Sequence, residues 1–335
     1  MRAVPIVAIV LLAGAAGLAP AVDSPDQAQI DFANGLFHRG FFKEAVDEYE
    51  RYLKEYPQGA AAATARYRLA EAAYAAHEYD KALAAYDAVL SAPPDDATRL
   101  QATLSKGEVL CYLKRFDEAL ALLQPLSGAE QPPEVRARAL YYIGKTQHEA
   151  GNQDAALAGF KTLIEALPDH PLAFYARYQI AYVYLARNEL ENAAVEFSGV
   201  ANSQAEPELR MECRYRAAET YDKMGWFNQA VGAYEQLRTE FPDSDYARRA
   251  DYGYALALYH AGKYTDAIAA AASFASAHPD SPYLVEMNYL RANCLQQQKK
   301  YDEALAIYQT IRQQNPNAEY AMRAQYKTAW TLYLK

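Results

Sequence analysis

Small residues and aromatic residues recur along this chain at a fixed interval of 37 positions. The most regular column is alanine, which occupies one position in eight successive segments: Ala45, Ala82, Ala119, Ala156, Ala193, Ala230, Ala267 and Ala304. Twelve residues before this column every segment has Ala or Gly, and four residues after it six of the eight segments have Tyr or Phe. Several columns in one register indicate a tandem repeat.

The columns predict two helices in each repeat. From Thr64 to Ala73, small and apolar residues return at the i, i+3, i+4 spacing of a helix with one apolar stripe, here called helix A. A turn follows around His77, a position at which four other repeats have glycine, the residue that most easily ends a helix. Helix B is predicted from about Tyr79 to Ala92, with its alanine and its aromatic residue facing helix A.

Proline ends most of the B helices. It stands twelve residues after the column alanine in six of the eight repeats, and Asp or Ser often follows to cap the next helix A, as at Ser244 and Ser281. The third and fifth repeats lack this proline. Pro125 interrupts the third helix B, and Ala205 takes the place of proline in the fifth repeat, so the easiest local opening is predicted at 125–134 and 200–208.

This order of columns resembles the tetratricopeptide repeat, and the resemblance covers residues 22–335, or about eight and a half repeats. It implies an all-α, right-handed α-solenoid built from helix-turn-helix repeats. The period of 37 exceeds the family's usual length of about 34, and the signature tryptophan is absent. The longer repeat is similar to the bacterial envelope subgroup of the Tol–Pal and outer-membrane assembly systems. The family's basic clamp is not matched, because Ile30 occupies the first lysine position.

Residues 1–21 are predicted to be a signal peptide. One positive charge at Arg2 precedes the uncharged segment 4–18, and Ala19-Pro20-Ala21 fits cleavage after Ala21. The apolar segment is shorter than the roughly 20 residues of a membrane-spanning helix, although an uncleaved anchor is the alternative. No cysteine lies near the cleavage site. The mature chain is therefore predicted to be exported and periplasmic, not a lipoprotein, and without an integral membrane segment.

Composition and motifs argue against several functional classes. A net charge of −9 disfavours nucleic acid as a partner, because phosphate binding requires a cationic surface. The six histidines are scattered and no nucleotide-binding or hydrolase motif occurs, so we expect no enzyme, no cofactor and no metal. Cys111, Cys213 and Cys294 fall in separate, non-adjacent repeats and are predicted to be free, buried thiols. The sequence leaves the oligomeric state open.

Candidate binding residues lie on the A helices. The column three residues before the small residue, here called the tyrosine ladder, consists of Tyr67, Leu104, Tyr141, Tyr178, Tyr215, Tyr252, Tyr289 and Tyr326. It is expected to point away from helix B, and the family resemblance implies that it lines a concave groove; alternatively, the rings only pack between successive A helices. Residues expected to be exposed on the same face vary between repeats: Arg68, Glu71, Tyr74, Lys145, His148, Tyr182, Glu219, Lys223, Tyr259 and His260. They are either specificity residues or ordinary solvated side chains.

These features favour an exported, non-catalytic scaffold that binds a protein or peptide in the groove, as part of a bacterial envelope complex. The alternative is a glycan-binding or enzyme-accessory module in which tyrosines such as Tyr215 and Tyr252 stack on sugars. The last predicted helix A, around 326–334, is strongly apolar. It is either a terminal cap or the beginning of a further repeat.

Overall fold

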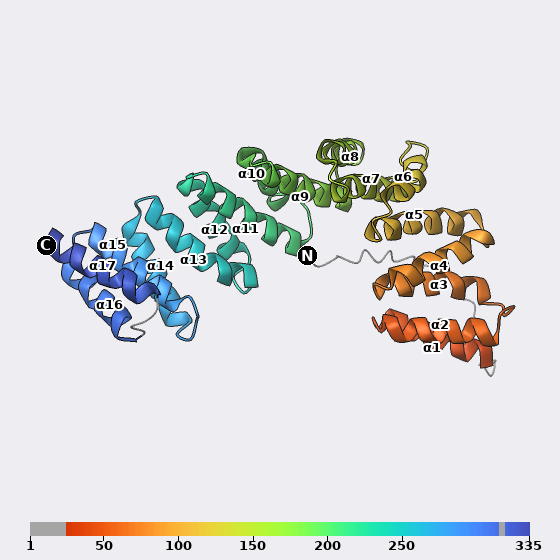
Figure 1. Ribbon diagram of the computed structural model, residues 1–335, viewed down its shortest axis with the longest axis horizontal. Helices are drawn as coiled ribbons and strands as arrows, with labels where there is room; N and C mark the ends of the chain where they lie inside the picture. The colour runs from red at the N-terminus through yellow and green to blue at the C-terminus, as the bar shows by residue number, and fades with distance from the viewer. Residues whose placement is uncertain (1–24, 315–318) are drawn as a thin grey trace. The chain divides into compact units, whose positions relative to one another are not determined.

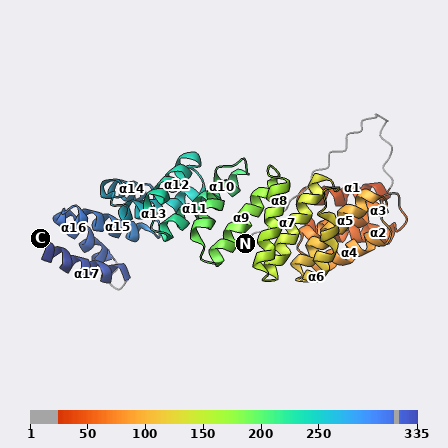
Figure 2. The same cartoon turned by 90° about the horizontal axis from the view of Figure 1, so that it is seen from above.

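The computed structural model describes residues 25–314 and 319–335, and the regular elements in these ranges are all helical (Figures 1 and 2). The predicted signal peptide lies outside them. The chain forms two compact units, one ending at Ala173 and the other beginning at Phe174. In the N-terminal unit the elements are α1 (Pro25–His38), α2 (Phe42–Glu55), α3 (Ala62–Ala75), α4 (Tyr79–Ser91), α5 (Asp96–Tyr112), α6 (Phe116–Leu123), the 3₁₀ turn η1 (Gln124–Leu126), α7 (Pro133–Glu149) and α8 (Gln153–Ala166).

The boundary between the two units falls within α9 (Pro171–Ala186). The C-terminal unit continues with α10 (Leu190–Ala201), α11 (Pro207–Lys223), α12 (Phe227–Glu240), α13 (Asp245–His260), α14 (Tyr264–Ala277), α15 (Leu284–Gln297), α16 (Tyr301–Gln314) and α17 (Glu319–Leu334). Odd-numbered helices are the A helices and even-numbered helices are the B helices. The prediction of an all-α chain of helix pairs is confirmed.

The eight column alanines lie where each helix B crosses its helix A, and all eight are completely buried. The small residue of helix A is required by the side chain that faces it. A Cβ atom placed on Gly144 would come within 2.7 Å of the Phe160 ring, and one on Gly107 within 2.7 Å of Leu123. The large residue on helix B thus fills the space that the small residue on helix A leaves open.

The turn between helices A and B has the same backbone conformation in every repeat. Four of the eight turn residues are glycines with positive φ, as the sequence predicts: Gly40, Gly151, Gly225 and Gly262. At the equivalent place His77, Lys114, Asn188 and Lys299 also have φ values near +60°, between 58° and 63°. The repeat therefore fixes the left-handed conformation even where the residue bears a side chain that disfavours it.

Two of the junctions between repeats follow a different pattern, and they are the two without the column proline. The helices after them, α7 and α11, begin at Pro133 and Pro207, two repeats apart. Three residues later each has an arginine whose Nε donates to a carbonyl near the end of the preceding helix pair: Arg136 to Ser127 at 3.3 Å and Arg210 to Ala201 at 3.4 Å. Proline at the first helical position and an arginine contact replace the usual proline stop.

The predicted capping serines have different roles. Ser244 caps α13, since its Oγ accepts a hydrogen bond from the Ala247 amide at 3.0 Å. Ser281 does not cap α15 as expected, because that helix begins only at Leu284. Its Oγ accepts from the Tyr283 amide at 3.2 Å and orders the turn before the helix.

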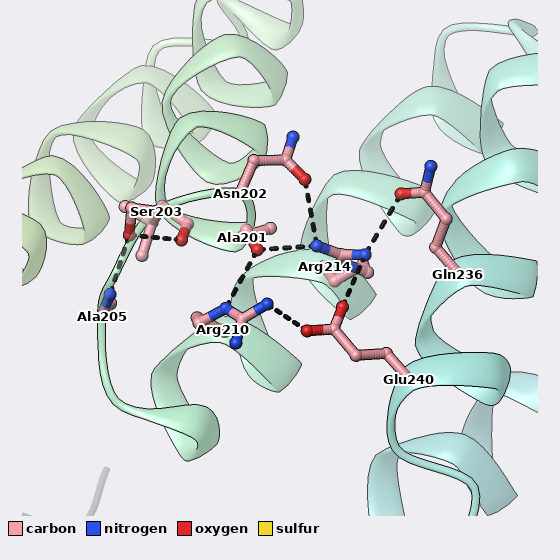
Figure 3. A network of polar contacts seen from close by, with 9 residues as sticks. Ala201, Asn202, Ser203, Ala205, Arg210, Arg214, Gln236 and Glu240 are labelled. Atoms are coloured by element: carbon pink, nitrogen blue, oxygen red, sulfur yellow. Dashed lines mark hydrogen bonds and ion pairs between the residues drawn. The ribbon is translucent and has the colours of Figure 1, made fainter.

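A buried arginine reinforces the junction between α10 and α11 (Figure 3). The guanidinium of Arg214 donates to the Ala201 carbonyl at 2.7 Å and to Asn202 Oδ1 at 3.0 Å. It also contacts α12, where it pairs with Glu240 at 3.0 Å and donates to Gln236 at 3.2 Å. Burial lowers the pKa of Arg214, which is 7% exposed, and the opposing charge of Glu240 offsets part of that effect. One side chain thus joins the end of α10 to α11 and α12.

The two unusual junctions are expected to differ in local stability. Arg214 holds 200–208 through a buried guanidinium, whereas Arg136 contacts 125–134 through one long hydrogen bond. This network argues against the expected easy opening at 200–208. We therefore expect amides of 125–134 to exchange hydrogen about tenfold faster than those of 200–208, a difference of about one buried hydrogen bond. Exchange monitored by mass spectrometry will measure this, and equal rates in the two segments would contradict it.

Candidate functional site

The tyrosine ladder packs within the repeats. Tyr67, Tyr141, Tyr178, Tyr215 and Tyr289 each lie with their ring centroid 5.8–6.4 Å from the aromatic ring on helix B of the same repeat. The expectation that the ladder points away from helix B is wrong. Residues three apart on a helix share a face, so the ladder shares the face of the small residue that meets helix B.

The contacts of the remaining ladder residues depend on which residue of helix B lies opposite them. Leu104 is fully buried. Tyr252 has only Ala271 opposite it and stacks instead on Tyr283, at 6.1 Å between ring centroids. Tyr326 is 69% exposed; it lies on α17, which has no helix B after it in the described part of the chain. Two ladder rings also contact the next helix A, Tyr215 with Tyr246 at 5.8 Å and Tyr289 with Tyr320 at 5.4 Å between ring centroids. The ladder thus packs within the repeats and, at these positions, also between successive A helices, as the alternative reading expected.

A polar network joins three successive A helices of the N-terminal unit. Glu108 on α5 is 2% exposed and accepts a hydrogen bond from Arg138 Nε on α7 at 2.9 Å. Tyr74 on α3 donates to the other oxygen of Glu108 at 3.3 Å and lies 3.2 Å from the Tyr142 hydroxyl. The carboxylate is buried but it is neutralised and hydrogen-bonded, which is the condition for a stable buried charge.

Lys145 lies beside this network. Its Nζ is 4.0 Å from the centroid of the Tyr112 ring and donates to the Tyr112 hydroxyl at 2.9 Å. The Tyr112 ring in turn stacks on Tyr79, with centroids 4.9 Å apart and planes within 1° of parallel. The predicted site residue Lys145 is thus held against aromatic rings, a geometry that stabilises an ammonium group.

The C-terminal unit has a polar network that joins α9 and α11. Tyr178 donates to Glu212 at 2.8 Å and stands 3.4 Å from the Tyr182 hydroxyl. Arg216 pairs with Glu219 at 2.9 Å and with Glu212 at 3.8 Å, and so links the two carboxylates. The predicted residues Tyr178, Tyr182 and Glu219 are therefore brought together, through groups that the sequence reading did not single out.

The other predicted residues lie at separate places along the A helices. Arg68 pairs with Glu71 at 2.8 Å, and burial raises the pKa of Glu71. His148 contacts Gln153 at 3.0 Å, and Tyr259 lies with its ring centroid 5.6 Å from that of His260. Lys223 is the last residue of α11 and is exposed. The structure thus brings some of the candidates into networks and leaves the rest as local pairs.

Sequence reasoning missed one column that the networks use. The polar column lies three residues before the ladder and includes Gln101, Arg138, Glu212, Arg249 and Arg323. Arg138 donates to Gln101 at 3.1 Å as well as to Glu108. The signal was available in the sequence, because this column is one helical turn before the ladder and carries a polar or aromatic side chain in each repeat.

The three cysteines are unpaired and buried, as expected. Burial raises the pKa of each thiol, to about 12 for Cys294. Because the thiolate is the reactive form, we expect less than a tenth of the thiols to react with an aromatic disulfide reagent at pH 8 within minutes in the folded protein. All three are expected to react once the unreduced protein is unfolded in guanidinium. Fewer than three thiols in that titration would contradict the assignment.

Within residues 25–314 and 319–335, no group of three or more His, Cys, Asp and Glu side chains is arranged to hold a metal ion. None of the helices described in these ranges is both long enough and apolar enough to cross a membrane.

Two families match parts of the chain. The family described as tetratricopeptide repeat matches residues 30–97 and 104–171, and the YfiO family, described as an outer membrane lipoprotein, matches residues 207–329. No curated protein matches this chain. The description of the YfiO family stands against the expectation that the protein is not a lipoprotein.

Several solved structures share the helical repeat. The apo form of RapI is 9% identical, with a TM-score of 0.53, and the match covers 81% of this chain and 82% of that one. PilW, a type IV pilus biogenesis factor, is 21% identical with a TM-score of 0.49, over 68% and 99% of the two chains. PilF of Pseudomonas aeruginosa is 19% identical with a TM-score of 0.47, over 67% and 95%. At these identities the similarity concerns the fold alone.

Proposed function

Because this chain is a tetratricopeptide repeat protein whose C-terminal repeats match a family of outer membrane lipoproteins, we propose that it is a non-catalytic scaffold of the bacterial envelope. It binds a protein or peptide segment along the exposed parts of its A helices. The observation that carries the proposal is the contrast between the two kinds of column. The column alanines are identical and buried in all eight repeats, whereas the polar groups on the A helices differ from repeat to repeat.

A constant core with a variable surface is what a modular binding protein requires. The core columns hold each helix pair together, and the surface positions are free to match different residues of a partner. Rigid tyrosine rings and arginines are the side chains that contribute most to protein interfaces, and both are frequent on these A helices. The paired charges hold these rings in fixed orientations before the partner arrives, which reduces the entropy cost of binding.

The glycan alternative receives less support. Sugar stacking requires a free ring face, and the two tyrosines considered for that role are both in contact with other groups. The guanidinium of Arg249 lies 4.9 Å from the centre of the Tyr215 ring, and Tyr252 stacks on Tyr283. We therefore retain a protein or peptide as the partner.

Export and processing form part of the proposal. A signal peptide at residues 1–21 delivers the chain to the periplasm and is removed after Ala21. The mature protein should then begin at Val22 and carry no lipid, which intact-mass spectrometry of the protein purified from the envelope will measure. A mass that includes acyl chains would instead place this protein with the lipoproteins of the matched family.

Site-specific photo-cross-linking tests the binding role. p-Benzoylphenylalanine placed at Tyr182 or Tyr259, both half-buried on A helices, is expected to capture the same partner protein in living cells. Val195 on α10 is 68% exposed on a helix B and is the matched control, from which no capture of that protein is expected. Equal capture from Val195, or no defined product from the A-helix positions, would overturn the proposal.

A further inference from the structure

A cavity of about 600 Å³ opens in the C-terminal unit, beside the start of α13, the end of α14 and the segment that precedes α15. Its lining combines cationic and aromatic side chains with a carboxylate: Arg248, Arg249, Phe274, His278, Tyr283 and Asp280. Of these residues, Arg249 belongs to the polar column described above. The volume is within the range of pockets that bind small ligands or single side chains of a peptide.

Arg249 is the cation of this cavity that the protein leaves without an anion. In the described part of the chain it forms no ion pair, and its guanidinium rests 4.9 Å from the Tyr215 ring centre and 5.5 Å from that of Tyr246. The two neighbouring cations differ. Arg248 pairs with Asp245, and His278 faces Asp251, a carboxylate that already accepts a hydrogen bond from Arg238 at 2.7 Å.

The other arginines of the polar column differ from Arg249, because each forms an ion pair. Arg138 pairs with the buried Glu108, and Arg323 pairs with Glu319 at 2.5 Å. In each case the chain supplies the carboxylate. Arg249, an exposed residue, instead lies against two aromatic rings, and its planar guanidinium suits a carboxylate from another molecule.

Charges around the cavity restrict what such a molecule can be. Two carboxylates line the cavity: Asp280, which is exposed, and Asp245, which pairs with Arg248. The whole chain has a net charge of −9. A run of acidic residues would be repelled, whereas one acidic side chain flanked by uncharged residues would not. Phe274 and Tyr283 offer an apolar wall for a neighbouring side chain.

We propose that this cavity is a peptide subsite that binds one isolated Asp or Glu side chain through Arg249, with an adjacent apolar residue against Phe274 and Tyr283. The inference rests on the proposed function, since it specifies which segment of a partner the A helices of the C-terminal unit select. It names a side-chain carboxylate because the peptide passes along the A helices rather than ending there.

Affinity selection with two peptide pools tests the proposal. Both pools contain acetylated, amidated octapeptides with uncharged residues at six positions, and the central pair is Asp-Phe in one pool and Asn-Phe in the other. The immobilised full-length protein is expected to retain the Asp-Phe pool at least about tenfold better, the size of one charge-assisted contact. A third pool with Asn-Phe and a free C-terminus tests the terminal carboxylate, and retention of that pool at the same level would overturn the assignment to a side chain.

Four variants test which residue causes the preference for the Asp-Phe pool. Arg249→Gln should remove the preference for Asp-Phe, and Arg249→Lys should keep only part of it, because lysine lacks the planar fork. Asp280→Asn should strengthen retention about twofold by removing a like charge at the rim. Arg323→Gln alters a paired arginine of the same column and should change nothing. Circular dichroism melting of each variant verifies its fold.

The results separate this inference from the function on which it rests. If cross-linking from Tyr182 and Tyr259 succeeds but Asp-Phe peptides are not preferred, or if Arg249→Gln preserves the preference, the subsite is refuted and the scaffold remains. If the cross-linking fails, the proposed function is refuted whether or not the Asp-Phe peptides are preferred.

Discussion

Replacing Arg214 with methionine is expected to lower the protein's free energy of unfolding by about 3 kcal/mol. The guanidinium is almost fully buried and makes contacts with Ala201, Asn202 and Glu240. Methionine fills a similar volume but leaves the Ala201 carbonyl with only the longer hydrogen bond from Arg210, and Glu240 without one of its two cations. The loss is larger than that of an ordinary surface ion pair because these groups are partly removed from water.

Arg177 provides the matched control for this prediction. It occupies the same repeat position one period earlier, its side chain is 38% exposed, and it pairs with Glu196 at 3.1 Å. Arg177→Met is expected to cost less than about 1 kcal/mol, as is usual for exposed pairs. Urea titrations of the two variants, followed by circular dichroism, measure both effects. Similar losses for Arg177→Met and Arg214→Met would show that the junction does not depend on the buried guanidinium.

Phe160→Ala is expected to destabilise the protein by about 4 kcal/mol. The ring is completely buried on α8, and the absence of a side chain at Gly144 on α7 is what admits it. Alanine would leave a cavity that the two helices cannot close without losing their other contacts. Phe160→Leu should cost only about 1–2 kcal/mol, because Leu123 fills the equivalent space beside Gly107 in the preceding repeat.

A control substitution at an exposed phenylalanine distinguishes the loss of a buried ring from the loss of any phenylalanine. Phe41, just before α2, is 48% exposed, and Phe41→Ala is expected to change the free energy of unfolding by less than about 1 kcal/mol. The midpoints of urea denaturation for the three variants provide the measurement. If Phe160→Ala and Phe160→Leu are equally destabilised, the pairing of small and large residues does not explain the core.

Much of the candidate site was accessible from the sequence, although the predicted direction of the tyrosine ladder was wrong. The 37-residue period located the tyrosine ladder, yet the prediction that Tyr215 points away from helix B was wrong. Helical spacing alone settles this, since a residue three positions before the small residue lies on its face. The pairing of Arg138 with Glu108 could not be predicted, because it joins residues of adjacent repeats whose distance depends on how the A helices pack.

At the two junctions without the column proline, too, some features could be predicted from the sequence and others depended on how the helices pack. Their prolines and arginines are visible in the sequence at Pro133, Arg136, Pro207 and Arg210. That one of these junctions is also held by a buried guanidinium followed only from the approach of α10, α11 and α12 around Arg214.

The sequence by itself determined the helix pairs, their period, the turn positions and the buried alanines. These features depend on the backbone and on residues close together along the chain, and the same residue pattern recurs in each repeat. Only the tertiary structure decided which charges are neutralised and which, like Arg249, remain available. The reason is physical: a salt bridge depends on distances of a few ångströms between side chains of different helices, and a repeated pattern fixes the helices without fixing those distances.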